Sequence, residues 1–570
     1  MKNSRTSCSA AAPPSPRRHI HMNRTLENRF YYLDNFHTVV NWIAERYDTL
    51  LDSGERSFIA RFGALPQSSR ALLVRMVMRK GELFRSGKLR YEEIGDTREA
   101  AAALVDAGWV DGEPLLTLEQ LFGLLTKAEI EKLFRDRLPK TASRKGDQLE
   151  ALRGAFPDAR TFMQWRAQAD ECVYQLRIGD MCDRLRLMFF GNLHQDWTEF
   201  VLSDLGIYRY EKVEFSTSSQ AFRNRKDVDD YLHIFRCRER FEAGEPVEAV
   251  LADVPAQPLD NTWLEQRRAR FLFHVAQHFE RLQDWDNALR LYSGIRYPGA
   301  RMRRIRVMEL SGLHEQALAL AQEATAQPES EAESQQLQRM LPRLLRKLGQ
   351  PKPQARTTRT VTEFELRLPQ PQEVYSVEDL VRADIAGPDA PVWYVENTLV
   401  NSLFGLLCWK AVFTAVPGAF FHPFHAGPAD LHSEDFRLRR SDVFNDCLSA
   451  LDSEGYKDII RANYRDKFGI QSPFVYWDIL DEDLLATALD CLPAAHLKRW
   501  FERILLDIRA NRSGFPDLIQ FWPTEKRYRM VEVKAPGDRL QDNQLRWLDF
   551  FAEHGMPVAV CYVQWTEDAT

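Results

Sequence analysis

Three charged residues toward the carboxyl-terminal end of the chain have the types and spacing of a phosphodiester-cleaving site. Asp517 follows Pro516 at the start of one apolar stretch, and Glu532 and Lys534 lie two residues apart in the next. In a strand, residues i and i+2 point to the same face, so the Glu532 carboxylate and the Lys534 ammonium emerge together. Carboxylate oxygens bind Mg²⁺ or Mn²⁺, and an ammonium orients an attacking water or stabilises charge on phosphorus. The spacing therefore predicts metal-assisted phosphodiester hydrolysis.

Three apolar stretches are expected to form the strands that position this site. A hairpin through "PTEKRY" would bring Asp517 beside Glu532 and Lys534. The alternative is an exposed hairpin with ordinary surface charges. Val531 and Val533 disfavour it, because they look like the buried face of a core strand whose charged face is covered by a helix. The Val533 carbonyl is a natural further metal ligand. The expected strands are 517–522, 528–535 and 558–565.

The same region resembles a family of nucleases. Pro516-Asp517 followed by Glu532-Val533-Lys534 is similar to the PD-(D/E)xK signature, and a longer run resembles the VRR-type nuclease domain of that superfamily. The resemblance implies that Gln544, on the helix after the strand, lies beside the active site and supports contacts to substrate or to the metal's water. The alternative for Gln544 is a capping or surface role. The longer run comprises Gly514 to Asp517, Glu532 to Leu540, Gln544, Trp547 and Leu548.

The upstream sequence narrows the resemblance to the Fanconi-anaemia-associated nuclease family. The stretches "RKGELFRSGKLRYEEI", "DLGIYRYE", "ENTLVNSLFGLLCWKAVF" and "PADLHSEDF" are similar to that family, which combines a SAP-containing DNA-binding region, a tetratricopeptide-like middle and a VRR nuclease. Glu396 matches the additional acidic residue of the family's site, which implies a metal ligand carried on a helix. Without the resemblance, Glu396 would be an acid that the helix dipole favours near an amino-terminal end.

The resemblance implies an activity and a ligand set. The activity is that of a 5′-flap endonuclease and 5′-to-3′ exonuclease in interstrand-crosslink repair, acting on branched or 5′-flap DNA. One or two Mg²⁺ or Mn²⁺ ions would be held by Glu396, Asp517, Glu532 and the Val533 carbonyl, with Lys534 assisting the attacking water. The leader lacks the Cys/His spacing of a ubiquitin-binding zinc finger, which indicates a bacterial-type member; the sequence does not give the oligomeric state.

Composition indicates a globular chain of several domains. Its 570 residues are 44% hydrophobic and 28% charged, and the formal net charge is −6, so any DNA-binding surface must be local. Eight scattered cysteines and the absence of a long apolar run or a secretion signal favour a cytoplasmic, nucleoid-associated protein. We expect a mostly α, multidomain chain, divided into a disordered leader (1–25), a helical DNA-binding region (26–260), a tetratricopeptide-like helical domain (261–350) and an α/β PD-(D/E)xK nuclease domain (375–570).

Two helical segments resemble modules that bind or display other molecules. Residues 115–155 read as a helix, a turn and a second helix, and resemble a SAP module, a binder of the DNA backbone. From 262 to 345 the pattern is almost continuously helical, with an Ala-Leu pair recurring at Ala288 and Ala317, as in a degenerate helical-pair array. The residues from 161 to 257 are expected to be helical and receive no chemical role.

Clustered cations in these segments are candidates for DNA contacts. In the helical stretch 71–110, cations interleave with aromatics, and the alternative is a solvated helix face. The run "RYPGARMRRIR" holds five arginines without an acid, which suits phosphate; the alternative is an intramolecular salt-bridge face. The predicted DNA-binding residues are Arg75, Arg79, Lys80, Arg85, Lys88, Arg90, Lys127, Arg144, Lys145, Arg301, Arg303, Arg304 and Arg306.

Other readings of the chain have less support. His422 and His425 form a His-x-x-His pair, but no cysteine lies close, so we read them as loop histidines and not as zinc ligands. A non-catalytic scaffold that binds DNA junctions is the first alternative function. A second is a helical adaptor whose carboxyl-terminal domain acts on RNA or Holliday junctions.

Overall fold

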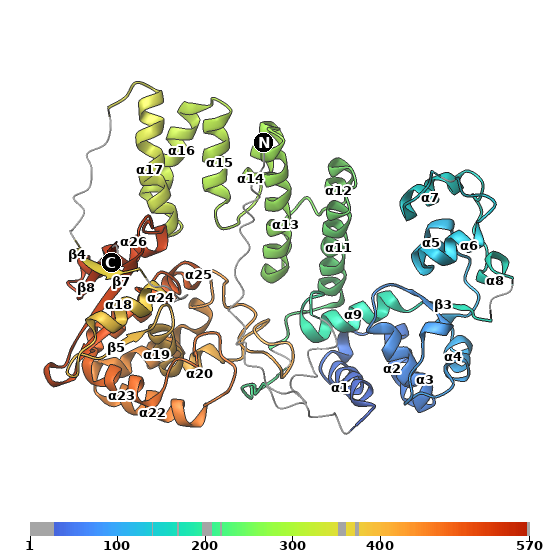
Figure 1. The fold of residues 1–570 in the computed structure, drawn as a ribbon, viewed down its shortest axis with the longest axis horizontal. Helices are drawn as coiled ribbons and strands as arrows, with labels where there is room; N and C mark the ends of the chain where they lie inside the picture. The colour runs from blue at the N-terminus through green and yellow to red at the C-terminus, as the bar shows by residue number, and fades with distance from the viewer. Residues whose placement is uncertain are drawn as a thin grey trace.

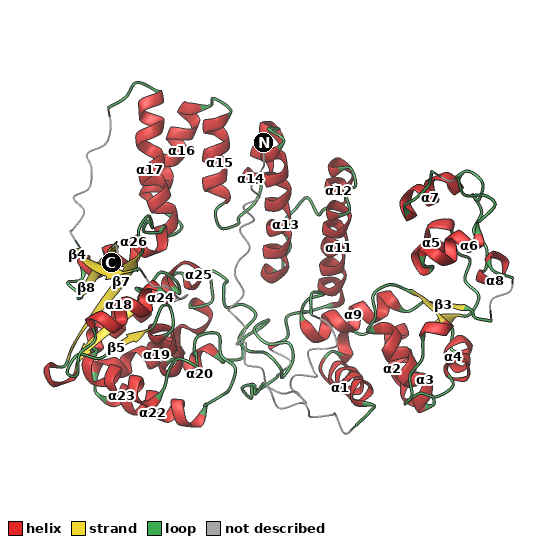
Figure 2. Cartoon of the chain, in the orientation of Figure 1, coloured by secondary structure: helices red, strands yellow, loops and turns green. Residues whose placement is uncertain are grey.

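Helices make up most of the structure, and within its described residues strands gather in two small sheets (Figure 2). In Figure 1 the amino-terminal elements lie at one end of the molecule and the carboxyl-terminal elements at the other, and the helices of residues 225–347 span the distance between them. The mostly α, multidomain prediction is therefore confirmed. The computed structural model describes residues 28–139, 141–167, 170–195, 208–216, 219–351, 361–370 and 376–566, and the predicted leader lies outside these ranges.

Within the described ranges, no helix combines the length and the apolar character needed to cross a bilayer. The seven cysteines of these ranges are all free thiols.

The amino-terminal part packs five helices around one apolar core beside a three-stranded antiparallel sheet. The predicted helical pattern through residues 71–110 is interrupted, because the chain turns at Gly81, whose φ is +87°, and enters a strand. The sheet order is β1-β3-β2. The elements are α1 (Tyr31–Arg46), α2 (Ser53–Ala64), α3 (Gln67–Val77), β1 (Leu83–Arg85), α4 (Thr97–Asp106), β2 (Val110–Asp111), β3 (Val173–Leu176) and α9 (Gly179–Phe190).

The segment predicted to resemble a SAP module forms a small helical unit with its own core. Its first predicted helix is two helices, because Thr126 caps a new one: the Thr126 side chain accepts from the Glu129 N–H, and Glu129 accepts from the Thr126 N–H. The helices are α5 (Leu118–Leu124), α6 (Lys127–Leu133), α7 (Lys145–Arg153) and α8 (Phe162–Trp165).

The middle of the chain is an array of helices: the first and third pack against each other, and from the third onward each helix packs against the next. The two Ala-Leu pairs lie in alternate helices, and Ala288 and Ala317 are both fully buried, as an array of helical pairs requires. The helices are α11 (Arg225–Glu242), α12 (Val247–Asp253), α13 (Thr262–Arg281), α14 (Trp285–Ser293), α15 (Ala300–Leu310), α16 (His314–Ala326) and α17 (Glu331–Lys347).

The carboxyl-terminal part is built on a mixed five-stranded sheet in the order β4-β8-β7-β6-β5. The predicted strands are all present, and β6 and β7 form the predicted hairpin, whose register sets Leu518 opposite Val531. β8 runs parallel to both of its neighbours. The strands are β4 (Thr362–Pro369), β5 (Val392–Tyr394), β6 (Leu518–Trp522), β7 (Arg527–Lys534) and β8 (Val558–Thr566).

Helices cover both faces of this sheet. Val531 and Val533 face a small core shared with α18 (Val377–Ile385), as their alternation predicted. Met530 and Val560 face the larger core on the other side. The helices of that side are α19 (Leu399–Leu407), α20 (Trp409–Val412), α21 (Ser441–Ser449), α22 (Gly455–Asp466), α23 (Glu482–Cys491), α24 (Ala494–Leu506), α25 (Ile508–Asn511) and α26 (Asp542–Glu553).

Candidate active site

Asp517 lies just before β6, at the point where the β6–β7 pairing ends. Its side chain is 6% exposed, and its Oδ2 accepts a hydrogen bond from the Val533 N–H at 2.7 Å. The Asp517 carbonyl accepts from the Val395 N–H at 2.8 Å, which ties the residue to the segment that follows β5. The hairpin therefore brings the Asp517 carboxylate to the strand that carries the other two predicted residues.

Glu532 and Lys534 lie together on β7, as their spacing predicted. Lys534 Nζ is 2.7 Å from Glu532 Oε1, and the two residues are 7% and 0% exposed. Gln544 of α26 donates from Nε2 to the same Glu532 oxygen at 2.5 Å. The helix that carries Gln544 is one of those that cover this face of the sheet.

Gln544 caps its helix, which was the alternative role, and it also contacts the predicted acidic residue Glu532. Its Oε1 accepts from the Gln541 N–H at 2.8 Å, which caps the first turn of α26, while its Nε2 contacts Glu532. The capping bond fixes the orientation of the amide, because the oxygen must point back along the helix. The nitrogen is thereby directed at the carboxylate.

Glu396 lies in a turn, and the prediction that a helix carries it is wrong. Residues 392–394 pair with β6 as an edge strand, so α19 begins only at Leu399. The Glu396 carboxylate accepts from Tyr394 Oη at 2.6 Å and from Asn397 Nδ2 at 3.1 Å. Its charge nevertheless acts on both core carboxyls, since it raises the pKa of Asp517 and of Glu532.

Burial and crowding make the charged forms of these acids costly. Burial, the first cause, and the Glu396 charge raise the pKa of Asp517 to about 6. Burial and the Asp517 charge raise the pKa of Glu532 to about 8, although Lys534 acts in the opposite direction. Glu532 Oε2 is also buried without a hydrogen-bond partner among the described residues. The site has more negative charge than its one lysine offsets.

This deficit of positive charge fits a divalent cation. Within the described ranges, no three acidic, histidine or cysteine side chains already form a ligand cluster. The donor set is nonetheless of the hard-oxygen type that Mg²⁺ and Mn²⁺ take, with one orphaned carboxylate oxygen at its centre. The Val533 carbonyl faces the same side as its N–H, because both groups of a strand residue point to one neighbour, and that N–H contacts Asp517.

Sequence reasoning assigned no role to two residues that shape the site. Asn397, with φ of +53°, uses Oδ1 to accept from the N–H groups of Gly514 and Phe515, at 2.7 and 3.1 Å. Gly514 has φ of +96° and lies against Asn543 of α26. The "NT" after Glu396 and the glycine of "GFPD" were the only signals, and neither specifies a partner distant in sequence.

Removing the charge of Asp517 is expected to stabilise the metal-free protein at alkaline pH. A raised pKa means that the folded state binds its proton more tightly than the unfolded state, so the wild type loses stability as pH rises through about 6. Asp517→Asn lacks this loss. At about pH 8 its free energy of unfolding should exceed that of the wild type by up to about 3 kcal/mol, and its melting midpoint should be higher. At about pH 4 the two proteins should not differ in this way. Thermal melting in EDTA at both pH values checks it; equal midpoints at pH 8 would contradict it.

The predicted cations of the amino-terminal part divide into buried and exposed sets. Arg85 is 8% exposed and pairs with Glu129 at 2.6 Å and with Glu171, so it is a structural residue of the interior and not a DNA ligand. Arg75 pairs with Glu93 at 2.6 Å and stacks over Tyr32. Lys145 donates to the Leu125 carbonyl at 2.9 Å. The exposed cations are Arg79, Lys80, Lys88, Arg90, Lys127 and Arg144.

The predicted arginines of the helical array are all on α15, and most have carboxylate partners. Arg301 pairs with Glu333, at 2.5 Å, which is the salt-bridge alternative. Arg303 and Arg306 both pair with Glu280, at 3.2 and 3.1 Å. Arg304 is partly buried.

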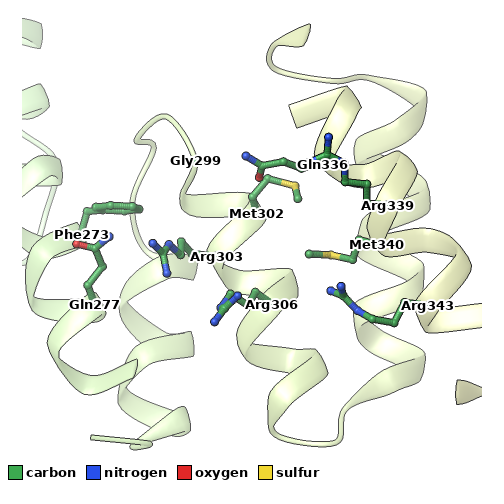
Figure 3. A pocket seen from close by; sticks show the side chains of 10 residues that line it. All are labelled: Phe273, Gln277, Gly299, Met302, Arg303, Arg306, Gln336, Arg339, Met340 and Arg343. Atoms are coloured by element: carbon green, nitrogen blue, oxygen red, sulfur yellow. The ribbon is translucent and has the colours of Figure 1, made fainter. Parts of the chain in front are cut away.

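Arg303 and Arg306 also line a cavity of about 420 Å³ between α13, α15 and α17 (Figure 3). Arg339 and Arg343 line it from α17. Sequence reasoning did not find Arg339 and Arg343. Their spacing is that of an ordinary helix and gives no sign that they face the arginines of α15.

His422 and His425 lie in the loop after α20, where they pack within aromatic side chains. Their ring centroids are 4.1 Å apart, and His422 stacks on Phe189 of the amino-terminal part. Burial lowers the pKa of both, to about 4 for His425. The pair therefore belongs to the contact between the amino-terminal and carboxyl-terminal parts of the chain.

Three family models match the chain. Residues 30–111 match the model described as "FAN1, HTH domain", and residues 115–165 match the "Fanconi anemia-associated nuclease SAP domain". Residues 452–565, which include Asp517, Glu532, Lys534 and Gln544, match the "VRR-NUC domain".

Relatives and a solved structure match over most of the chain. It is 59% identical to the Fanconi-associated nuclease 1 homolog of Pseudomonas aeruginosa, across 95% of this chain and 97% of that protein. It is 23% identical to the Arabidopsis thaliana homolog, across 94% of this chain and 67% of that protein. The crystal structure of paFAN1 bound to 2-nucleotide 5′-flap DNA with a gap is similar with a TM-score of 0.89 and 59% identity, across 95% and 100% of the two chains. The chain therefore belongs to the Fanconi-associated nuclease family and is a DNA nuclease whose VRR-NUC domain depends on a divalent metal.

Proposed function

We propose that the protein is a 5′-flap endonuclease and 5′-to-3′ exonuclease that acts on branched DNA in interstrand-crosslink repair. The observation that carries the proposal is the buried set of Asp517, Glu532 and Lys534 on the inner strands β6 and β7 and the residue before β6, with Gln544 held against it. The 5′-flap DNA in the crystal structures of the similar paFAN1 supports this substrate class. We place this activity in the cytoplasm, at the nucleoid.

We assign metal ligation to Glu396, Asp517, Glu532 and the Val533 carbonyl. One or two Mg²⁺ or Mn²⁺ ions, when bound, would neutralise charge on the scissile phosphate and lower the pKa of a water. Glu396 is held by Tyr394 and Asn397 at the rim, whereas Glu532 lies in the interior with one oxygen unpaired. These residues thus place one carboxylate at the rim and one in the interior.

We propose that Lys534 assists the attacking water and stabilises negative charge on the phosphate. Its Nζ lies 2.7 Å from Glu532 Oε1 and its side chain is 8% exposed, so its position is set before substrate arrives. An ammonium there donates to the attacking water or to a non-bridging phosphate oxygen, in a site from which bulk water is largely excluded. Gln544 holds the same carboxylate from the other side, which limits how far Glu532 can turn.

We propose that the DNA backbone runs over the exposed cations named above and over the arginine-walled cavity of the helical array. Arg79, Lys80, Lys88 and Arg90 follow α3, while Lys127 and Arg144 begin two helices of the SAP-like unit. Among the described residues, Arg303 and Arg306 share a single carboxylate partner, Glu280. We propose the domain division that the sequence predicts, with domains at 26–260, 261–350 and 375–570.

Cleavage of end-labelled DNA tests the proposal. Wild type and Asp517→Ala are compared on 5′-flap, 3′-flap, nicked, Holliday-junction and single-stranded DNA and on RNA, with Mg²⁺, Mn²⁺ or EDTA. We expect metal-dependent cutting near the 5′-flap junction that is lost in the variant. Flap binding without cutting would favour the scaffold, and preferred cutting of RNA or Holliday junctions would favour the other alternative.

Metal affinity is expected to rise with pH. The pKa of Asp517 is raised to about 6 and that of Glu532 to about 8, so cation binding must displace protons at neutral pH. Calorimetric titration with Mn²⁺ at about pH 5 and about pH 8, in buffers of different ionisation enthalpy, should show tighter binding at the higher pH and proton release near neutrality. An affinity independent of pH would contradict it.

A further inference from the structure

Three consecutive residues at the start of α26 contact three separate parts of the molecule. Asp542 binds α17 of the helical array. The backbone of Asn543 lies so close to Gly514 that a Cβ on that glycine would be 2.7 Å from its carbonyl carbon. Gln544 donates to Glu532. The first turn of α26 therefore joins the helical array, the loop that precedes β6 and the acidic site.

The contact with α17 is specific in geometry. Arg339 donates from Nη2 to Asp542 Oδ1 at 2.6 Å and from Nη1 to Oδ2 at 2.8 Å, which is the bidentate arrangement that fixes a carboxylate in orientation as well as distance. Gln335, one turn earlier, donates to the Asp542 carbonyl at 3.1 Å and accepts from Arg546 at 2.8 Å. Two adjacent turns of α17 thus hold two adjacent turns of α26.

We propose that Arg339 is a positioning residue for the nuclease site: its ion pair with Asp542 holds the first turn of α26, and so holds Gln544 against Glu532. The proposal rests on the proposed function. The pair is half-exposed, with side chains 53% and 49% accessible, and such pairs add little to the stability of a fold. Its loss should therefore affect the placement of the turn far more than folding.

The same guanidinium is placed to connect the site with the DNA path. Arg339 lines the arginine-walled cavity together with Arg303, Arg306 and Arg343 (Figure 3). The residue that holds the helix of the active site therefore also lies on the surface that we propose for phosphate contacts.

Steady-state cleavage of 5′-flap DNA separates positioning from binding. Asp542→Asn keeps every arginine of the cavity, and should lower kcat about 5- to 10-fold with KM changed less than about twofold. The reversed pair, Arg339→Glu with Asp542→Arg, should recover at least about half of kcat. In a Gln544→Ala background, Asp542→Asn should add less than about a twofold loss, because the group it positions is gone. The control is Asp483→Asn. Asp483 is an exposed acid in the first turn of α23, so this variant also removes a negative charge that a helix dipole favours, but at a helix without the contact to Arg339.

Amide hydrogen exchange provides a second measurement, which does not depend on DNA cleavage. The amides of residues 542–546 should exchange faster in Asp542→Asn and return toward wild type in the reversed pair. Unchanged kcat and unchanged exchange in Asp542→Asn, or a full additional loss in the Gln544→Ala background, would overturn the proposal. If wild type cleaved no flap, the proposed function would fail, while exchange at α26 would still decide whether Arg339 orders the turn.

Discussion

Replacing Lys534 with methionine is expected to lower the maximal rate of 5′-flap cleavage by at least about 10³-fold. Methionine fills nearly the same volume on β7, so the buried surroundings stay packed. What is lost is the ammonium 2.7 Å from Glu532 Oε1, and with it the only cation that partners this buried carboxylate in the described structure. Rates are compared at saturating DNA and at several metal concentrations, so that weaker metal binding is not mistaken for a slower chemical step.

The control for this change is Lys498→Met. Lys498 is on α24 of the same part of the molecule and pairs with Asp452 at 2.6 Å at the surface, so its loss removes one lysine and one ion pair without touching the site. It should cleave within about twofold of wild type. Flap affinity of Lys534→Met should also stay within about twofold, because the site holds one of many phosphate contacts. Full cleavage by Lys534→Met would refute the role we assign to this lysine.

Gly514→Ala is expected to lower cleavage about 100-fold and to lower the melting midpoint as well. Gly514 has φ of +96°, where an L side chain is strained, and its new Cβ would be 2.7 Å from the carbonyl carbon and 2.8 Å from the carbonyl oxygen of Asn543. Neither backbone can yield cheaply, since Asn397 holds the Gly514 N–H at 2.7 Å. We therefore expect the loop at Gly514 and the first turn of α26 to be forced apart, which would disturb the contact of Gln544 with Glu532.

Gly537→Ala is the control that separates backbone strain at the substituted glycine from displacement of the first turn of α26. Gly537 has a similar φ, +91°, but a Cβ there meets no atom within 4 Å. It should show the backbone strain alone, a loss of about 1–2 kcal/mol of stability, with a much smaller change in kcat. Kinetic assays and thermal melts of both variants make the comparison. Equal kcat values for the two would show that contact with Asn543 does not matter.

The acidic core of the site could be predicted because its geometry is local. Glu532 and Lys534 are two residues apart on one strand, and a tight hairpin brings the start of the preceding strand alongside, so strand periodicity and one turn suffice to assemble three residues. Glu396 was placed in the right neighbourhood by resemblance but on the wrong element, because a three-residue edge strand has little signal within an apolar run.

The arginines show what sequence patterns leave out. The run from Arg301 to Arg306 has no acid within it, yet its partners Glu280 and Glu333 come from other helices of the array. Arg85 is likewise neutralised by Glu129 and Glu171, which reach it through the packing of a small helical unit on a three-stranded sheet. Charge compensation is a tertiary property, so a cation-rich segment predicts a binding surface only after the fold has supplied its carboxylates.

The strand order of the carboxyl-terminal sheet has a consequence for biosynthesis. β8 is made after the other four strands, yet it lies between β4 and β7, and both pair with it in parallel. Until β8 has left the ribosome, β7 has no partner on one side, and Glu532 and Lys534 lie on an unsupported edge. Long-range parallel pairing also forms slowly. The amino-terminal helices can thus fold while synthesis continues, whereas the sheet that surrounds Glu532 and Lys534 can be completed only after β8 has been made.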